Sequence, residues 1–354
     1  MPAATALVTG NDPTPQLAEQ AVREALRRLD ADTPVGGILL FLSPEFTRHA
    51  TAAVVAAARA GKCLQVFGSV AAGVCTEAGW VLDRPAVAAM VLGAPLALTA
   101  PGAAETAPTL CCTSTPFPSE WRDSRRCGLH FHGTSGQSAV WQAGRLAEHG
   151  IAEAALRGAR PAFVVSTGLS PLATPRQASA VRGYDLLAVD GRKALDDLLA
   201  ALPPDWRERL PLHLVNASLT AADGEARSAA ILAANADRSL TLTTALQPGD
   251  RIQWAIRDPQ AAADETRAQL AGLDTRAADF ALYFSCIGRG PYFHGKDDLD
   301  LAALSERFPG LPMIGAYGTG QIAFHGMRSR QLQNAVVVAI YEESDKEDKD
   351  VVQP

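Results

Sequence analysis

The stretch that decides the fold runs Phe280-Ala281-Leu282-Tyr283-Phe284-Ser285-Cys286-Ile287-Gly288-Arg289-Gly290. Its first five residues are apolar, which is typical of a strand buried on both faces of a sheet. Farther on, Leu301, Leu304 and Phe308 recur at helical spacing, and Pro309-Gly310 ends that helix. We therefore predict a strand followed by a helix, which is a building unit of α/β folds.

Two more segments complete this C-terminal unit. Pro312-Met313-Ile314 predicts a second strand, and Gly315-Ala316-Tyr317-Gly318-Thr319-Gly320 predicts a glycine-rich loop at its end. Ala335–Ile340 predicts the last strand. Ligands of α/β sheets bind beyond the carboxyl ends of strands, so the loops at 285–290 and 315–320 are candidate binding loops.

The same order occurs near the N-terminus. Ile38–Leu42 predicts a buried strand, Ser43-Pro44 begins a helix that ends at Gly61, and Leu64–Phe67 predicts a strand that runs into residues 68–73. Ala86–Leu92 predicts the closing strand. Ser43 and Ser285 are 242 positions apart, and both Gly68/Gly315 and Gly73/Gly320 are 247 apart. These offsets predict that segments 38–92 and 280–341 are copies of one unit, with chance similarity as the alternative.

The residues between the two copies have another pattern. Ala162–Ser166, Tyr184–Val189 and His213–Ala217 predict short strands, and residues 228–256 predict hairpins around turn residues. Pro203-Pro204 ends a helix that begins near residue 194. The predicted fold class is therefore α/β with mixed α+β sheets, composed of two related halves and a hairpin-rich middle segment.

Composition excludes several classes of function. The net charge of −6 and the lack of a basic, aromatic-rich stripe argue against nucleic-acid binding. No apolar stretch reaches 18 residues and the first residues do not resemble a signal peptide, so we expect a cytoplasmic protein without a membrane segment. The six cysteines follow neither a zinc-binding nor a disulfide pattern, so free thiols and no metal site are expected. Phosphate-binding glycine motifs are absent, and residues 342–354 predict a disordered acidic tail.

The side chains best suited to bind or react with a ligand lie in the two predicted C-terminal loops. Arg289 offers a planar donor for a carboxylate or phosphate, and glycine N–H groups beside it could bind an anion. Cys286 is a buried, inert thiol, a nucleophile, or a contact to haem or a metal, and His294 is the nearest base in the sequence. These three roles for Cys286 stay open at this point.

Around these loops the sequence resembles the FIST family, in which an N-terminal FIST segment precedes a C-terminal one. Residues 284–290 match the family pattern F-S-C-x-G-R-G, and residues 311–322 resemble P-x-x-G-x-Y-x-x-G-E-I. Residues 67–73, 77–80, 158–161 and 189–194 resemble its N-terminal motifs. Two positions depart from the family: Gln321 replaces a usual glutamate, and Ser69 replaces a frequent cysteine.

The resemblance implies a FIST N-terminal domain at 15–210 and a FIST C-terminal domain at 211–341. It implies a cytoplasmic sensory protein that binds a small polar ligand, such as an amino acid, and signals to a partner such as a kinase or a cyclic-di-GMP enzyme. No cofactor is expected, although some members bind haem. The candidate ligand-binding residues are Ser285, Cys286, Gly288, Arg289, Tyr317, Gly318, Gly320, Gln321, Asn334, Gly68, Ser69 and Gly73. The alternatives are an enzyme that uses Cys286 and a haem-based gas sensor.

Overall fold

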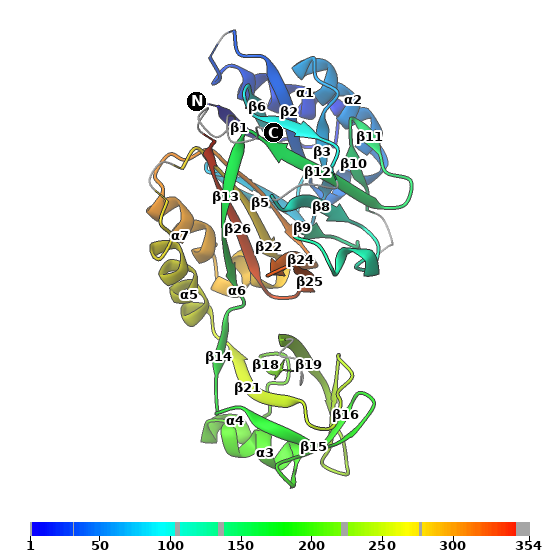
Figure 1. Cartoon of the computed structure of the whole chain (residues 1–354), viewed down its shortest axis with the longest axis vertical. Coiled ribbons are helices and arrows are strands. Elements are labelled where there is room, and N and C mark those ends of the chain that lie inside the picture. Colours follow the sequence, from blue (N-terminus) through cyan, green and yellow to red (C-terminus); the bar gives the residue numbers. More distant parts are fainter. Residues whose placement is uncertain are drawn as a thin grey trace, which may run out of the picture. The chain divides into compact units, whose positions relative to one another are not determined.

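The protein is described by a computed structural model that covers residues 2–30, 32–102, 107–133, 138–220, 226–275 and 278–344. The chain forms two compact units (Figure 1): unit 1 contains residues 1–167 and 266–354, and unit 2 contains residues 168–265. Helices and mixed sheets occur together, which confirms the predicted α/β class. Within the described residues, no helix is long and apolar enough to cross a membrane.

The first sheet of unit 1 is covered by two helices. Ile38, Leu40 and Leu42 face the helices, whereas Leu39 and Phe41 face the opposite side, because side chains alternate along a strand. The helices α1 (Pro15–Leu26) and α2 (Ala50–Gly61) contribute small residues to this contact, and a 3₁₀ turn at Pro44–His49 precedes α2. The sheet contains, in spatial order, β1 (Ala3–Thr9), β6 (Ala86–Gly93), β2 (Val35–Leu42), β3 (Val66–Val70), β10 (Val140–Gln142) and β11 (Arg145–Leu146).

The second sheet of unit 1 is covered by α5 (Pro259–Ala271) and α7 (Leu299–Arg307). Leu270 of α5 and Leu304 of α7 pack on Tyr283 and Val338 of this sheet. The short helix α6 (Pro291–His294) follows a 3₁₀ turn at Ile287–Arg289. The sheet contains, in spatial order, β13 (Ala159–Ser166), β26 (Val336–Glu343), β22 (Phe280–Cys286), β23 (Met313–Gly318), β4 (Gly73–Thr76) and β5 (Gly79–Leu82).

Their apolar faces share one core. The rings of Phe41 in β2 and Phe284 in β22 meet edge to face at 6.0 Å. Figure 1 accordingly shows α1 and α2 on one side of unit 1 and α5 and α7 on another. A third sheet, which also contributes to this core, contains β25 (Arg328–Leu332), β24 (Gly320–His325), β9 (Arg126–His130), β8 (Thr109–Thr113), β12 (Ile151–Arg157) and β7 (Ala97–Thr99). A 3₁₀ turn at Ser119–Trp121 precedes β9.

The predicted duplication is confirmed by the topology. In each half a strand is parallel to the next one (β2 with β3, β22 with β23) and antiparallel to the last one (β2 with β6, β22 with β26). The copies extend farther than predicted, because β1 and α1 correspond to β13 and α5. The sequence analysis missed β1, whose alternation of small and apolar residues is short and weak.

The register corrects two sequence predictions. Leu42 lies opposite Val70 and Val87, as Ser285 lies opposite Tyr317 and Val336, so Ser285 corresponds to Leu42 and not to Ser43. Ser43 corresponds to Cys286, since their backbone N–H groups donate to the carbonyls of Ala86 and Ala335. The loops predicted at 68–73 and 315–320 are wrong, because these glycines lie mostly within strands β3, β4, β23 and β24.

Unit 2 is inserted between β13 and the last turns of α5. In the first half, the corresponding elements β1 and α1 are joined by residues 10–14 alone. It is rich in antiparallel strands, as the hairpin-rich pattern predicted, and it has a core of its own, which the sequence analysis did not predict. Its sheet orders β14 (Leu169–Pro171), β21 (Arg251–Arg257), β15 (Arg176–Arg182), β16 (Asp185–Val189), β20 (Leu240–Leu242), β19 (Ala226–Ala234) and β18 (Val215–Thr220). β17 (Arg192–Lys193) pairs with β16, and the helices are α3 (Ala194–Ala201) and α4 (Pro204–Arg207).

The division into units differs from the predicted domain boundaries. The boundary expected between residues 210 and 211 lies inside unit 2. Compact units and family domains divide a chain by different criteria, so the predicted FIST domain limits stay predictions. The predicted acidic tail begins within β26, which continues through Glu343, and residues 345–354 lie outside the described residues.

Candidate functional site

Arg289 lies at the end of the 3₁₀ turn after β22, and its side chain is only 1% exposed. Its Nε donates to Asp300 Oδ2 at 2.9 Å, and its Nη2 donates to Asp300 Oδ1 at 3.0 Å. This two-point geometry is the strongest form of an arginine–carboxylate pair. The predicted ligand-binding arginine is therefore engaged by a carboxylate of the chain itself.

The guanidinium also donates hydrogen bonds to Ser166 and Thr266, the residues of unit 1 that lie at the two boundaries with unit 2 in the sequence. Nη1 donates to the carbonyl of Ser166 at 2.9 Å, and Nη2 donates to Ser166 Oγ at 2.5 Å and to Thr266 Oγ1 at 3.2 Å. Ser166 ends β13 just before unit 2, and Thr266 is the first residue of unit 1 after it. Arg289 thus fixes both ends of the insertion to one point of unit 1.

Asp300 accepts further hydrogen bonds that stabilise its ionised form. Thr266 Oγ1 donates to Oδ1 at 2.5 Å, and His294 Nε2 lies 3.0 Å from Oδ2. Burial acts to raise the pKa of Asp300, but the His294 contact and the Arg289 charge outweigh it and lower that pKa below its ordinary value. Asp300 is therefore a permanent counter-ion of Arg289 at neutral pH.

A second buried carboxylate, Asp298, joins the same cluster. It caps α7 by accepting from the N–H groups of Asp300 and Leu301, and it accepts from Tyr317 Oη at 2.7 Å and Tyr283 Oη at 3.0 Å. Burial raises the pKa of Asp298. Burial and the nearby Asp298 charge also raise the pKa of both tyrosines well above the ordinary value, so their hydroxyls stay protonated donors.

The structure brings several predicted residues together at the strand ends. Cys286 Sγ lies 3.9 Å from Asn334 Oδ1, and Arg289 Nη1 lies 3.5 Å from the Asn334 carbonyl. Gln321 is fully buried, and its Oε1 accepts from the Ala335 N–H at 3.4 Å, whereas its Nε2 has no hydrogen-bond partner among the described residues. Ser285 is also fully buried. These side chains form a packed polar cluster, and whether a ligand contacts them stays a prediction.

The predicted glycines act mainly through packing. A Cβ on Gly73 would lie 2.0 Å from Leu82, and one on Gly318 would lie 2.4 Å from the His130 carbonyl. A Cβ on Gly320 would lie 2.5 Å from the Gln331 side chain, whereas Gly288 is exposed. Neighbouring strands approach so closely that no side chain fits at the first two positions. The remaining candidates, Gly68 and Ser69, belong to β3 of the other sheet, where they pair with β10.

Ligand atoms of His294, Asp298 and Asp300 lie within 4.8 Å of one another, which is close enough to consider a metal ion. The hydrogen bonds argue against one. Both oxygens of Asp300 accept from Arg289, and both oxygens of Asp298 accept from tyrosine hydroxyls. A cation there would have to displace these donors and lie beside a guanidinium. The residues therefore fit an ion-pair network and not a metal centre.

An open cleft of about 360 Å³ lies elsewhere in unit 1, where the edge strands β13 and β25 of two sheets meet. Phe163 and Phe324 are two of its lining residues, and their rings touch each other edge to face at 4.9 Å between the ring centres. Its other lining residues are Cys127, Val165, Thr167, Gln269, Ala323, His325, Arg330, Leu332 and Val337. The sequence analysis missed this cleft, because residues from β9, β13, α5, β24, β25 and β26 meet only in the folded chain.

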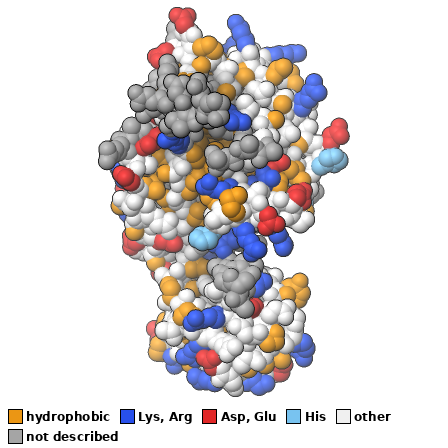
Figure 2. All heavy atoms as spheres, viewed as in Figure 1, with side chains coloured by type: hydrophobic (Ala, Val, Ile, Leu, Met, Phe, Trp, Pro, Cys, Tyr) orange, Lys and Arg blue, Asp and Glu red, His pale blue; other side chains and the backbone are white. Residues whose placement is uncertain are grey.

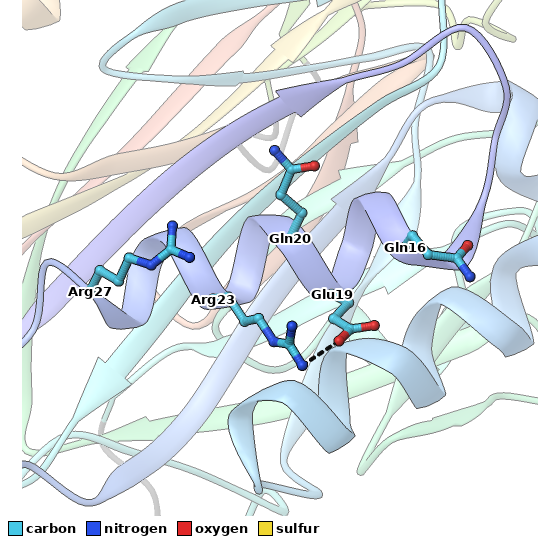
Figure 3. A pocket seen from close by; sticks show the side chains of 5 residues that line it. All are labelled: Gln16, Glu19, Gln20, Arg23 and Arg27. Atoms are coloured by element: carbon cyan, nitrogen blue, oxygen red, sulfur yellow. Dashed lines mark ion pairs between the residues drawn. The ribbon is translucent and has the colours of Figure 1, made fainter.

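A second hollow of about 310 Å³ lies along the exposed face of α1. Its lining residues are Gln16, Glu19, Gln20, Arg23 and Arg27. Figure 3 shows these side chains spread along one helix, with an ion pair between Arg23 and Glu19 at 2.5 Å. A single row of solvated side chains cannot enclose a ligand, so this hollow is a surface feature.

The chain matches no curated protein. The family match given below includes Arg289, Asp298 and Asp300 and also Phe324 of the cleft, but not Ser166 or Asn334. The predicted N-terminal FIST domain stays a prediction. Residues 192–324 match the FIST C domain, which is a sensory-type domain family.

Proposed function

We propose that this chain is a cytoplasmic sensory protein that binds a small polar ligand and passes the occupancy of its site to a signalling partner. The match of residues 192–324 to the FIST C domain carries this proposal, since that family is of the sensory type. A kinase or a cyclic-di-GMP enzyme is the expected class of partner, in line with the family resemblance.

The geometry around Cys286 supports sensing over catalysis. Cys286 is 6% exposed, and the closest side-chain partner of its sulfur is the Asn334 amide oxygen, which cannot act as a base. The Nε2 atom of His294 faces Asp300. A cysteine nucleophile needs a base or a cation within reach to lower its pKa.

A thermal-shift screen with the purified full-length chain tests the proposal. The screen contains amino acids, small mono- and dicarboxylates, sugars and nucleotides at millimolar concentrations. A ligand that binds only the folded state at a hundredfold excess over its dissociation constant stabilises by about 2.7 kcal/mol. We expect at least one class to raise the melting temperature in a saturable way.

Two controls complete the experiment. Titration calorimetry must reproduce the affinity, and the absorbance spectrum of the protein tests the haem alternative. If no compound stabilises the protein and purified candidate partners respond to none of them, the sensory proposal is refuted.

A further inference from the structure

The cleft between β13 and β25 combines apolar walls with a basic rim. Its inner lining consists of Cys127, Val165, Ala323, Leu332 and Val337, all of which are apolar, and the thiol of Cys127 is held neutral because burial raises its pKa to about 12. Such a surface is stabilised when a hydrocarbon group covers it, because both then bury apolar area away from water. The inner part of the cleft thus fits the apolar portion of a ligand.

The charged residues of the lining are of one sign. Arg330 and His325 are its ionisable side chains besides Cys127, and Thr167 and Gln269 add polar groups. Arg125 lies beside the cleft, with its guanidinium 4.5 Å from the centre of the Phe324 ring. Figure 2 shows basic, acidic and hydrophobic side chains in the region where Figure 1 draws β24 and β25, so the basic character is that of the cleft lining itself. No aspartate or glutamate lines the cleft among the described residues.

We propose that this cleft binds a compact amphipathic carboxylate, with its hydrocarbon part packed against the contacting rings of Phe163 and Phe324 and its carboxylate at Arg330. The volume of about 360 Å³ lies at the lower end of the range for small-molecule sites. A guanidinium is the preferred partner of a carboxylate. Since the described residues of the lining include no acidic side chain to pair with an ammonium group, a simple carboxylate binds better than the corresponding amino acid.

This inference rests on the proposed sensory function and names the ligand class for it. Phenylacetate, phenylalanine, phenylacetamide and 2-phenylethylamine share one ring and differ in charge, so they serve as probes. Titration calorimetry and ligand-observed NMR on the full chain measure their dissociation constants. We expect phenylacetate to bind at least tenfold more tightly than each of the other three.

Three variants locate the site. Arg330→Met removes the charge and keeps an apolar stem, so it should weaken phenylacetate at least tenfold and leave phenylacetamide unchanged. Arg328→Met is the matched control, because Arg328 lies two residues away on β25, is 68% exposed and does not line the cleft. Val165→Trp fills the cleft and should abolish binding of the aromatic probes. Leu332→Trp serves the same purpose if the first tryptophan variant does not fold.

The results separate this inference from the sensory proposal. If the amine binds as tightly as phenylacetate, or if binding persists in a folded tryptophan variant, the inference is overturned. If the wider screen yields a ligand whose affinity is unchanged by Arg330→Met and by the tryptophan that fills the cleft, the sensory function stands and the proposed site is wrong. If no compound binds at all, both fail.

Discussion

The buried Arg289 shows how a residue can have the chemistry of a ligand contact and yet be engaged within the protein. Arg289→Ala leaves Asp300 ionised, buried and deprived of its strongest partner. Breaking a buried pair in this way costs about 3–5 kcal/mol. We expect urea unfolding to show a loss of this size, whereas Arg328→Ala at the surface should change stability by less than about 0.5 kcal/mol. If Arg289→Ala unfolds with the same free energy as the wild-type protein, the buried pair makes no contribution to stability.

The sign of the pH dependence gives a second measurement on the same pair. The pKa of Asp300 is lowered in the folded state, so its contribution is present above the unfolded pKa and is lost as the pH falls through the folded value. Wild-type protein should lose this contribution below about pH 4, near the ordinary pKa of an aspartate. In Arg289→Ala this part of the acid dependence should shrink. An unchanged slope of unfolding free energy against pH would contradict the assignment.

The six thiols should differ sharply in reactivity. All six are free, and five are buried, with Cys63 as the partly exposed exception. Burial raises the pKa of Cys112 and Cys127 to about 12, so almost no thiolate exists at neutral pH. We expect rapid alkylation at Cys63 in the native protein and at all six sites after denaturation, with mass spectrometry as the readout. Rapid native labelling of Cys286 would instead revive the enzyme alternative.

Sequence reasoning at this scale predicted that the candidate site residues lie close together, but it did not predict their partners. Cys286, Arg289 and Tyr317 lie at or just beyond the adjacent ends of the parallel strands β22 and β23, and Asn334 approaches them from the turn before β26. Ser166 is 123 positions away from Arg289 in the chain, and nothing in the pattern around Ser166 pointed to Arg289. A single sequence carries no signal for such a contact.

At the scale of elements, the duplication explains two glycines in corresponding places. Gly68 pairs with Leu40, and Gly315 pairs with Tyr283, in the two parallel strand pairs. A Cβ would lie 1.8 Å from the Leu40 carbonyl in one case and 2.4 Å from the Tyr283 carbonyl in the other. We expect Gly68→Ala and Gly315→Ala each to destabilise by at least about 2 kcal/mol, because the backbone must shift.

The matched control for these variants is Gly272→Ala at the end of α5. Its nearest non-neighbouring atom would be 3.5 Å from the new Cβ, which is ordinary contact. That change should be neutral or stabilise by up to about 1 kcal/mol, since it reduces the freedom of the unfolded chain. Equal effects of all three alanines on thermal unfolding would refute the packing role of the two strand glycines.

Long apolar or periodic runs in the sequence predicted most helices and strands correctly, whereas segments with a weak pattern were missed or assigned wrongly. The strand at 280–286 and the helix at 299–307 were predicted from long apolar or periodic runs. The run from Gly315 to Gly320 resembled a loop because glycine is rare within strands, but here it permits close packing of neighbouring strands. Tertiary packing thus overrode local propensity at the segment that mattered most for the site.

At the scale of the whole molecule, unit 2 is an insertion that unit 1 should survive without. Arg289 holds Ser166 and Thr266 together, and seven helical residues at about 1.5 Å each place the start of α5 roughly 10 Å from Thr266. A linker as long as residues 10–14 can span that distance. A chain in which such a linker replaces residues 168–257 should fold cooperatively, with a circular dichroism spectrum that retains its helical signal. An unfolded product would show that unit 1 depends on unit 2.

The hairpin of β4 and β5 pairs with β23, so a segment of the first half completes the sheet of the second half. A lone ancestral copy would have exposed that strand edge, and it could have covered it by exchanging hairpins with an identical molecule. Gene fusion would then have joined two swapped partners. In the present chain β10 occupies the corresponding edge of β3, and the hairpin of β24 and β25, which corresponds to β4 and β5, pairs with β9 instead. Fragments 1–158 and 159–354 should accordingly be insoluble when expressed separately and should reconstitute the fold when expressed together.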